Sequence, residues 1–333
     1  GVSAAGVRAM GRDPAERRLA LKGLGRWLGL DRELEADTGY RRGGGLRVAL
    51  DDKALRAAPD WAAEQCADGV PLETVDAASA RRLAPGITPG CLGGVYSSID
   101  GHAGAMATVE AFAAAARRLG ARIEEGVGVK RLVAERGRVV GIERGDGTRQ
   151  PCAVAILTAG AWTSSLLAGL GVKLPLHTRP LQMLLTEPGP GALAPVVGCF
   201  DRKLSLKQLD GGAYLIGGGW PARIADHETN RWDVLDDSVK GSLEVAGEVY
   251  PALTDCKLAE SWAGLEAFTP DDLPVIGPVP GVDGVLVAAG FSGHGFALTP
   301  VVGDVLARLA LGRDALEHLC CDLRFDRPAL AGS

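Results

Sequence analysis

The chain has 333 residues, of which 47% are hydrophobic, and its formal net charge is −5. This length predicts about two domains, and the negative charge argues against nucleic acid or an anionic membrane as a partner. No apolar run reaches the ~18 residues that a membrane-spanning helix needs. The 47 glycines are about twice the usual share, which favours a mixed α/β enzyme with many turns over a helical bundle.

The cysteines are dispersed along the chain, and no C-x-x-C motif is present. There are seven of them, at positions 66, 91, 152, 199, 256, 320 and 321. An odd, scattered set predicts reduced thiols and a cytoplasmic location rather than a disulfide framework. We expect no metal site.

The first half of the chain is predicted to alternate helices with short strands. Residues 13–30 predict a helix that Asp13 can cap and in which Pro14 suits the first position. A glycine-rich strand in "GYRRGGGLRVAL", a helix over 53–65 and a short helix before Pro85 are expected to follow.

The clearest helix is predicted over residues 103–119, where apolar residues recur at helical spacing. Its buried face is expected to carry Met106, Val109, Ala113, Ala116 and Leu119. A run of strands follows, and it ends in the buried strand of "VAILTAGAW" and a short helix.

The second half begins with a different pattern. Residues 172–262 predict a mainly antiparallel sheet, interrupted by one helix at about 233–249. From residue 274 the α/β pattern returns, so two domains are expected to interleave along the chain.

A glycine-rich turn between a buried strand and a helix is the most distinctive local feature. The apolar run 285–289 predicts the strand, and the helix has an apolar face that includes Val301, Val302 and Val305. Thr299 is expected to cap this helix, with Pro300 at its first position. Between strand and helix, backbone without side chains either turns sharply or lies against a bound group.

Three common motifs are absent or lack their context. The stretch 290–294 resembles the G-x-S-x-G nucleophile elbow of serine hydrolases, but its fifth residue is His294. No P-loop is present. The G-x-G-x-x-A of residues 217–222 is followed by a polar, aperiodic segment rather than by the helix that a dinucleotide loop must open into.

Several residues have two interpretations at this stage. Arg8 fits a surface charge, His102 fits a loop residue, and His294 fits a turn residue, while each also fits a site. Residues 158–160 are small residues at the end of a buried strand. Two buried strands thus end in small residues and lead into helices, and a doubly wound sheet binds its ligand at such carboxyl ends.

Four segments together resemble the FAD-dependent D-amino-acid oxidase family, which includes glycine oxidase, sarcosine oxidase and related amine dehydrogenases. They are "GVSAAGVRAMGRD", "IDGHAGAMATVEAFAAAARRLGARI", "VAILTAGAW" and "SWAGLEAFTPDDLPVIGPVPGVDGVLVAAGFSGHGFALTPVVGDVL". The most specific is the last, in which W-x-G-x-x-x-x-T-P-D-x-x-P-x-I-G precedes G-F-S-G-H-G-F.

The resemblance implies an α/β (α+β) fold, in which an incomplete FAD-binding Rossmann-like domain interleaves with a mainly antiparallel-sheet substrate domain. The expected FAD-binding domain comprises residues 1–38, 101–171 and 263–333, and the expected substrate-binding domain comprises 39–100 and 172–262. The family's N-terminal β-α-β unit with G-x-G-x-x-G is expected to precede Gly1. Without it, or a separate polypeptide that supplies it, we expect weak FAD binding or none.

The resemblance also implies roles for individual residues. Arg8 is expected to grip the substrate carboxylate, and His294 is expected to lie beside the flavin; these are the predicted catalytic residues. Lys207, Gln208 and Trp220 are predicted substrate contacts. The predicted cofactor-binding residues are Ser3, Ala4, Ala5, Gly6, Val129, Thr158, Ala159, Gly160, Gly264, Gly290, Phe291, Ser292, Gly293, Gly295, Phe296 and Thr299.

Two departures from the family bear on the subtype. Monomeric sarcosine oxidase has a lysine where this chain has Ala297, and it attaches its flavin through a cysteine near the equivalent of residues 264–270, where this chain has none. FAD is therefore expected to be non-covalent. The implied reaction is hydride transfer from the α-carbon of a small amino or imino acid to flavin N5, by a dehydrogenase-type subunit that passes electrons to a partner subunit or acceptor. The alternatives are a flavin-free, non-catalytic homologue and, more distantly, a serine hydrolase.

Overall fold

The computed structural model describes residues 3–226, 231–313 and 317–331. The chain divides into two compact units. Unit 1 comprises Gly1–Arg17, Trp27–Ala111 and Pro180–Gly264, and unit 2 comprises Arg18–Arg26, Phe112–Arg179 and Leu265–Ser333. Each unit contains both helices and strands, so the mixed α/β class predicted from the sequence is confirmed.

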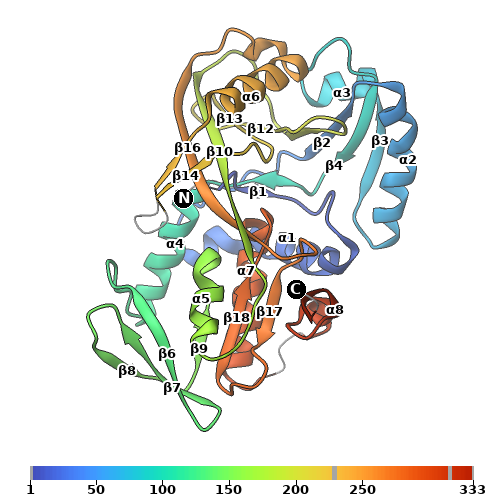
Figure 1. The fold of residues 1–333 in the computed structure, drawn as a ribbon. Coiled ribbons are helices and arrows are strands. Elements are labelled where there is room, and N and C mark those ends of the chain that lie inside the picture. The colour runs from blue at the N-terminus through green and yellow to red at the C-terminus, as the bar shows by residue number, and fades with distance from the viewer. Residues whose placement is uncertain (1–2, 227–230, 314–316, 332–333) are drawn as a thin grey trace. The chain divides into compact units, whose positions relative to one another are not determined.

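Unit 1 contains most of an eight-stranded sheet with the order β16-β10-β13-β12-β11-β2-β4-β3 (Figure 1). The first residues of β10 and the last residues of β16 belong to unit 2. The strands are β2 (Gly45–Ala49), β3 (Leu72–Asp76), β4 (Gly93–Ser97), β10 (His177–Pro188), β11 (Val196–Cys199), β12 (Ser205–Gln208), β13 (Ala213–Gly217) and β16 (Leu258–Phe268). β11 pairs with β2 in parallel. The pairs β10–β13, β11–β12, β12–β13, β2–β4 and β3–β4 are antiparallel, which confirms the predicted antiparallel character.

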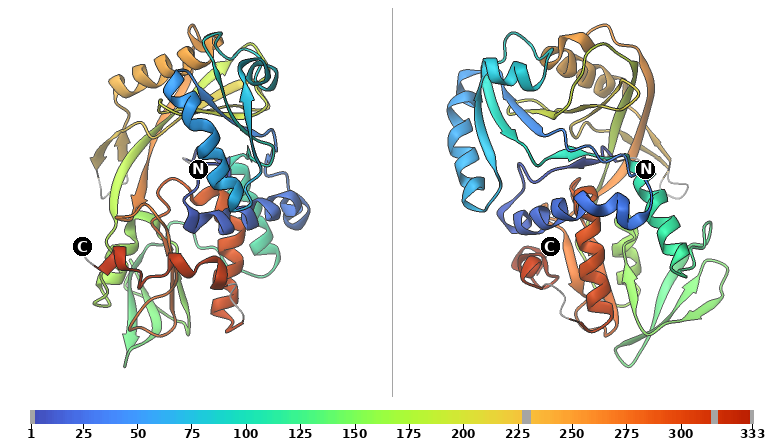
Figure 2. Two further views of the ribbon diagram at one scale, coloured as in Figure 1. Left: turned by 90° about the vertical axis from the view of Figure 1, so that its right-hand side faces the viewer. Right: turned by 180° about the vertical axis from the view of Figure 1, so that it is seen from behind.

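The two faces of this sheet differ because strand side chains alternate. One face buries an apolar cluster that includes Leu46, Val197 and Leu206, together with residues of α3 (Ala77–Leu83) and α6 (Asp236–Val249). Helix α2 (Asp52–Ala67) lies along β3 and β4 (Figure 2).

Unit 2 contains a three-stranded sheet with the order β17-β18-β9. β17 (Val275–Pro278) is antiparallel to β18 (Val285–Ala289), which runs parallel to β9 (Ala155–Leu157). After β9 come the 3₁₀ turn η1 (Gly160–Trp162) and α5 (Thr163–Ala168), and after β18 comes α7 (Gly295–Ala310). A second sheet is a meander of β6 (Val129–Glu135), β7 (Arg138–Arg144) and β8 (Arg149–Pro151) (Figure 1).

The remaining elements are shorter or connect these sheets. β1 (Gly6–Val7) pairs with β5 (Gly101–His102), and β14 (Arg223–Asp226) pairs with β15 (Arg231–Asp233). The other helices and 3₁₀ turns are α1 (Pro14–Leu34), α4 (Ala105–Arg118), α8 (Pro328–Ala331), η2 (Pro251–Leu253), η3 (Glu317–Leu319) and η4 (Cys321–Leu323).

Helix α1 forms as its local sequence predicts. The Asp13 carboxylate accepts a hydrogen bond from the Ala15 N–H at 2.9 Å, and Pro14 occupies the first position. Gly23 lies inside the helix because α7 passes close by: a Cβ at Gly23 would come within 3.1 Å of the Ala297 carbonyl oxygen. The G-x-G-x-x-A stretch leads into β14 rather than a helix, as expected.

Two expectations about helices are wrong. In α4 the buried residues are Thr108, Ala111 and Ala115, whereas Met106 and Val109 are 52% and 58% exposed. The helix buries its small-residue stripe, which allows close approach, rather than its larger apolar side chains.

Helix α7 begins at Gly295, five residues before the predicted first position. Pro300 therefore lies inside the helix, and the Thr299 hydroxyl donates to the Gly295 carbonyl oxygen at 3.3 Å instead of capping. The glycine turn leads directly into helical backbone, so no separate cap is needed further along.

Candidate active site

In unit 2, two predicted cofactor-binding segments meet at one edge of the sheet. β18 and β9 are parallel, with Val285 opposite Ala155 and Val287 opposite Leu157. Because parallel strands end at the same edge, the turn of residues 290–295 and the segment 158–160 both follow from it. The structure thus places together two segments that are about 130 residues apart in the sequence.

The glycine turn is explained largely by its own packing. Gly290 has φ +69°, and a Cβ there would meet Thr269 Cγ2 at 2.6 Å. Gly295 leaves room for the Phe291 ring, whose nearest atom would lie 2.9 Å from an added Cβ. Gly293 has φ +82° with nothing within 4 Å of its Cβ position. The turn therefore requires glycine for sharp backbone and close contact, and only Gly293 presents open backbone.

Ser292 does not have the geometry of a nucleophile. It is 8% exposed, and its hydroxyl donates to the Gly290 carbonyl oxygen at 3.2 Å. Its N–H donates to the Ala267 carbonyl oxygen at 3.1 Å. Both groups hold the turn in place.

Glu266 on β16 supports the same turn, a role that was not predicted from the sequence. Its Oε1 accepts a hydrogen bond from the Gly293 N–H at 2.9 Å. Burial raises the pKa of this carboxyl, and the bond from Gly293 offsets part of that rise. An acidic residue in the otherwise apolar stretch "WAGLEAF" was the available signal.

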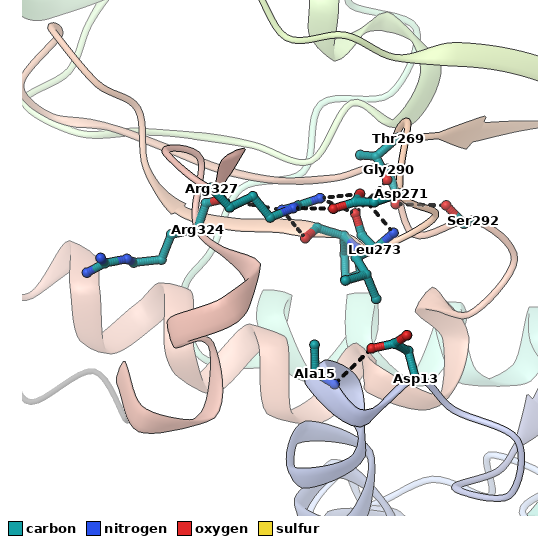
Figure 3. Close-up of polar contacts among 10 residues, drawn as sticks. Asp13, Ala15, Thr269, Asp271, Leu273, Gly290, Ser292, Arg324 and Arg327 are labelled. Carbon is teal, nitrogen blue, oxygen red and sulfur yellow. Dashed lines mark hydrogen bonds and ion pairs between the residues drawn. The ribbon is translucent and has the colours of Figure 1, made fainter. Parts of the chain in front are cut away.

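The T-P-D motif forms a clamped loop beside the turn (Figure 3). Arg327 donates to both Asp271 oxygens, at 2.7 Å from Nε and 2.9 Å from Nη2, which is the bidentate geometry of a strong ion pair. Arg327 also donates to the carbonyl oxygens of Leu273 and Pro274. The Thr269 hydroxyl donates to Leu273 O at 2.7 Å. This motif therefore has a structural role within unit 2.

A large cavity lies at the β9 side of the same unit, with a volume of about 1030 Å³. Its lining includes four predicted cofactor-binding residues, Val129, Thr158, Ala159 and Gly160, as well as Trp162. Gly160 has φ +52° and nothing within 4 Å of its Cβ position, so bare backbone faces the open space there. Small residues and exposed backbone suit a flat or phosphate-bearing ligand.

In unit 1, the predicted residues gather around β1 and β5. Gly6 pairs with His102, and Ala5 has a positive φ of 49°. The Ser3 hydroxyl oxygen accepts a hydrogen bond from the Ala5 N–H at 3.0 Å. Lys207 on β12 donates to the carbonyl oxygens of Ala4 and, at 3.5 Å, Ala103.

Burial shifts the pKa values of three titratable groups near these strands. Burial and the positive charge of Arg8 lower the pKa of Lys207 to about 7. Burial and Lys207 lower the pKa of His102 to about 4. Burial also lowers the pKa of Arg8, with Asp100 opposing that effect. Perturbed groups of this kind gather at functional sites.

The other predicted residues lie as follows. Gln208 joins loops, since its Oε1 accepts from Leu193 N at 2.9 Å and its Nε2 donates to Gly212 O at 3.1 Å. Trp220 Nε1 donates to Lys203 O at 3.1 Å. Gly264 is buried on β16, His294 precedes α7, Phe296 lies in its first turn and Thr299 is exposed. Of the predicted catalytic pair, Arg8 belongs to unit 1 and His294 to unit 2.

The chain belongs to a family of FAD-dependent oxidoreductases: the DAO family model, described as FAD dependent oxidoreductase, matches residues 1–309. Glycine oxidase of Pseudomonas putida is 30% identical, over 80% of this chain and 70% of the relative. YurR, an uncharacterized oxidoreductase of Bacillus subtilis, is 29% identical over 85% of this chain and 76% of its own length. The solved structure of L-proline dehydrogenase from P. horikoshii has a TM-score of 0.85 at 25% identity and covers 94% of this chain and 84% of that one.

These comparisons confirm the family predicted from the sequence, and they make the chain a member of an enzyme family rather than a serine hydrolase. Among the helices that the structure describes, none combines the length and the apolar character needed to cross a bilayer.

Proposed function

We propose that this chain oxidises the C–N bond of a small amino or imino acid with non-covalent FAD. The observation that carries the proposal is the meeting of segments 158–160 and 290–295 at one sheet edge of unit 2, beside a cavity of about 1030 Å³. A doubly wound sheet binds its cofactor at this edge. Membership of the FAD-dependent family supplies the cofactor's identity.

In this proposal the cofactor lies against residues 158–160, Val129 and the turn around Gly293, all in unit 2. The proposal also keeps the cofactor-binding roles that the family resemblance implies for Ser3–Gly6, Gly264, Phe296 and Thr299. The FAD-binding domain comprises 1–38, 101–171 and 263–333, and the substrate domain comprises 39–100 and 172–262. Residues 264–270 contain no cysteine to form a covalent link. The fit rests on Gly160, whose backbone faces the cavity without a neighbour at its Cβ position.

When bound, FAD would supply at N5 the acceptor for a hydride from the substrate α-carbon. The residues of this chain bind and orient the substrate. Arg8 holds the α-carboxylate through its guanidinium, whose buried Nε has no hydrogen-bond partner in the described chain. His294, Phe291 and Phe296 shield the reacting face from water, and orientation of this kind supplies much of the rate. Lys207 and Trp220 contribute to the substrate pocket.

The open edge of β9 supports a further part of the proposal. Among the described strands, β9 pairs only with β18, and Ile156 and Trp162 beside its free edge are 41% and 47% exposed. Parallel sheets are normally covered on both faces. We assign this edge to a β-α-β unit with a G-x-G-x-x-G turn, from polypeptide outside residues 1–333. The N-terminus of its helix would hold the FAD pyrophosphate.

The electrons leave to a partner subunit or acceptor, as in a dehydrogenase-type enzyme. A flavin-free homologue is the alternative, and FAD titration separates the two. The chain joined to such a β-α-β unit is expected to bind FAD, to show visible flavin absorbance and to lose Trp162 fluorescence through quenching. The Trp162→Phe variant controls for the five other tryptophans. A colourless extended protein with unquenched fluorescence would overturn the FAD assignment.

The role of Arg8 is tested separately in the same flavin-loaded protein. Arg8→Ala is expected to raise the Michaelis constant at least about tenfold, since a charge-assisted carboxylate contact contributes on the order of 1.5–3 kcal/mol. FAD affinity should stay within about twofold. An unchanged Michaelis constant would remove Arg8 from the substrate site and leave the cofactor assignment intact.

A further inference from the structure

The face of the unit 1 sheet opposite its apolar core carries two cations, the buried Lys207 and the half-buried Arg47. Leu46, Val197 and Leu206 form one cross-strand row and lie in the core. Arg47 and Lys207 each follow a member of that row by one position, so their side chains project from the opposite face. Only β11 separates their strands, which places their backbones about 10 Å apart.

Arg47 is held by aromatic rings in a fixed orientation. Its guanidinium carbon lies 5.4 Å from the centre of the Trp61 ring and 5.1 Å from that of Phe200, and these two rings meet edge to face. Gly11 lies beside both groups: a Cβ there would be in ordinary contact with Trp61 at 3.6 Å and Arg47 Nη1 at 4.0 Å, so its φ of +77° rather than space favours glycine. This arrangement orients the guanidinium without neutralising it.

The cations on this face lack anionic partners. Within the described residues, none of Arg8, Arg47 and Lys207 forms an ion pair, and the Nε atoms of both arginines are buried without a hydrogen-bond partner. Asp100 is the carboxylate nearby, but its oxygens already accept the N–H groups of Ala9 and Met10, at 2.9 and 3.3 Å. Burial, and after it the positive charge of Arg8, lowers the pKa of both Arg47 and Lys207, so the charges of the three residues interact.

The cluster carries more positive charge than the carboxylates around it balance. Buried Arg12 also interacts with Arg8 and with Glu16, so Arg8, Arg12, Arg47 and Lys207 face Asp100 and Glu16. Two positive charges remain while Lys207 is protonated. Because a buried unpaired charge is costly, a native ligand is expected to supply the balance. The α-carboxylate of a simple amino acid would supply one negative charge, through Arg8. A second anionic group would supply the other.

We infer that the substrate is an amino or imino acid with a second carboxylate, which Arg47 binds beside the rings of Trp61 and Phe200. The inference rests on the proposed function, because that function supplies the first carboxylate. A planar guanidinium suits a carboxylate through two parallel hydrogen bonds, and its fixed position sets how far apart the two acid groups must be. Arg47 is thus a specificity-determining residue.

The test compares carboxylate probes by calorimetric titration of the full chain at pH 6, where Lys207 is protonated. Glutarate and butyrate serve as the dicarboxylate and the monocarboxylate, at matched ionic strength, and inorganic phosphate serves as a generic anion. Glutarate is expected to bind at least about tenfold more tightly than either. Equal affinity for glutarate and butyrate would overturn the inference, as would phosphate binding as tight as that of glutarate.

Variants assign the preference to Arg47. Arg47→Gln should abolish the preference for glutarate, and Arg47→Lys, which keeps the charge without the planar fork, should retain only part of it. Arg56→Gln, on the exposed side of the same helix as Trp61, is the matched control and should bind like the wild type. A preference that survives Arg47→Gln overturns the inference. If butyrate binds as tightly as glutarate and its binding depends on Arg8, only this inference is overturned. The FAD titration decides the proposed function.

Discussion

The two units present different kinds of candidate site. In unit 1 the candidate site is formed by three buried or half-buried cations, Arg8, Arg47 and Lys207, which form no ion pair among the described residues. Lys207 donates to backbone carbonyls, and Arg47 lies over aromatic rings. In unit 2 the site is made of backbone and small residues, and its strongest charges, Asp271 and Arg327, neutralise each other. Unpaired charge suits recognition of a charged substrate, whereas a rigid turn of backbone and small residues suits a large flat group. Variants in each unit test this contrast.

The largest expected effect comes from Lys207. Its folded pKa of about 7 lies below the unfolded value of 10.5, so between these values the unfolded state binds more protons and stability rises with pH. Lys207→Met should therefore stabilise the protein by up to about 4 kcal/mol at pH 7, with the gain vanishing as pH approaches 10.5. Urea unfolding at both pH values measures it, with the exposed Lys240→Met as control. A gain independent of pH would show that Lys207 is not an uncompensated charge.

The next effect concerns the clamp of unit 2. Asp271→Ala leaves Arg327, whose side chain is 9% exposed, without its bidentate partner, and should lower the free energy of unfolding by about 3 kcal/mol. Asp326→Ala breaks the exposed pair with Arg324, 3.5 Å long, and should cost less than about 0.5 kcal/mol. Similar losses in the two variants, measured by denaturant unfolding, would contradict the clamp.

Two glycines in one turn distinguish the cost of a strained backbone φ from the cost of a steric clash. Gly290→Ala introduces both a strained φ and a contact of 2.6 Å with Thr269, so a loss of about 3 kcal/mol is expected. Gly293→Ala introduces the strained φ alone, since its Cβ would meet open space, and should cost about 1 kcal/mol. Thermal unfolding compares the two, and equal losses would mean that packing against Thr269 does not matter.

A structural feature of this chain can be predicted from the sequence when the residues that cause it are close to it in the sequence. The start of α1 was predictable because Asp13 caps it through a residue two positions away. The buried face of α4 was not, because helix packing selected its alanines over Met106 and Val109. The start of α7 was also missed, because the turn at Gly293 ends directly in helical backbone.

The candidate site also has parts that the local sequence predicts and parts that depend on distant residues. The turn at residues 290–295 and the segment 158–160 follow apolar strands, which the sequence shows directly. The partners of Lys207 are about 100 and 200 positions away, so no local pattern could indicate them. Arg47 had one signal, a charge between apolar neighbours in "GLRVAL", but its meaning required Trp61 and Phe200.

The smallest effect concerns Glu266, the carboxyl of unit 2 that is most like Lys207. Burial raises its pKa, so the folded state holds a proton that the unfolded state has lost, and stability falls as pH rises from its ordinary value of 4.5. Glu266→Gln keeps an acceptor for the Gly293 N–H and removes the charge. It should match the wild type at pH 4 and exceed its stability at pH 7 by about 1 kcal/mol or less. The slope is opposite in sign to that of Lys207. If the variant and the wild type are equally stable at both pH values, the Glu266 carboxylate is as well stabilised in the fold as in water. The charges near the turn of unit 2 would then all be stabilised, in contrast to the unpaired cations of unit 1.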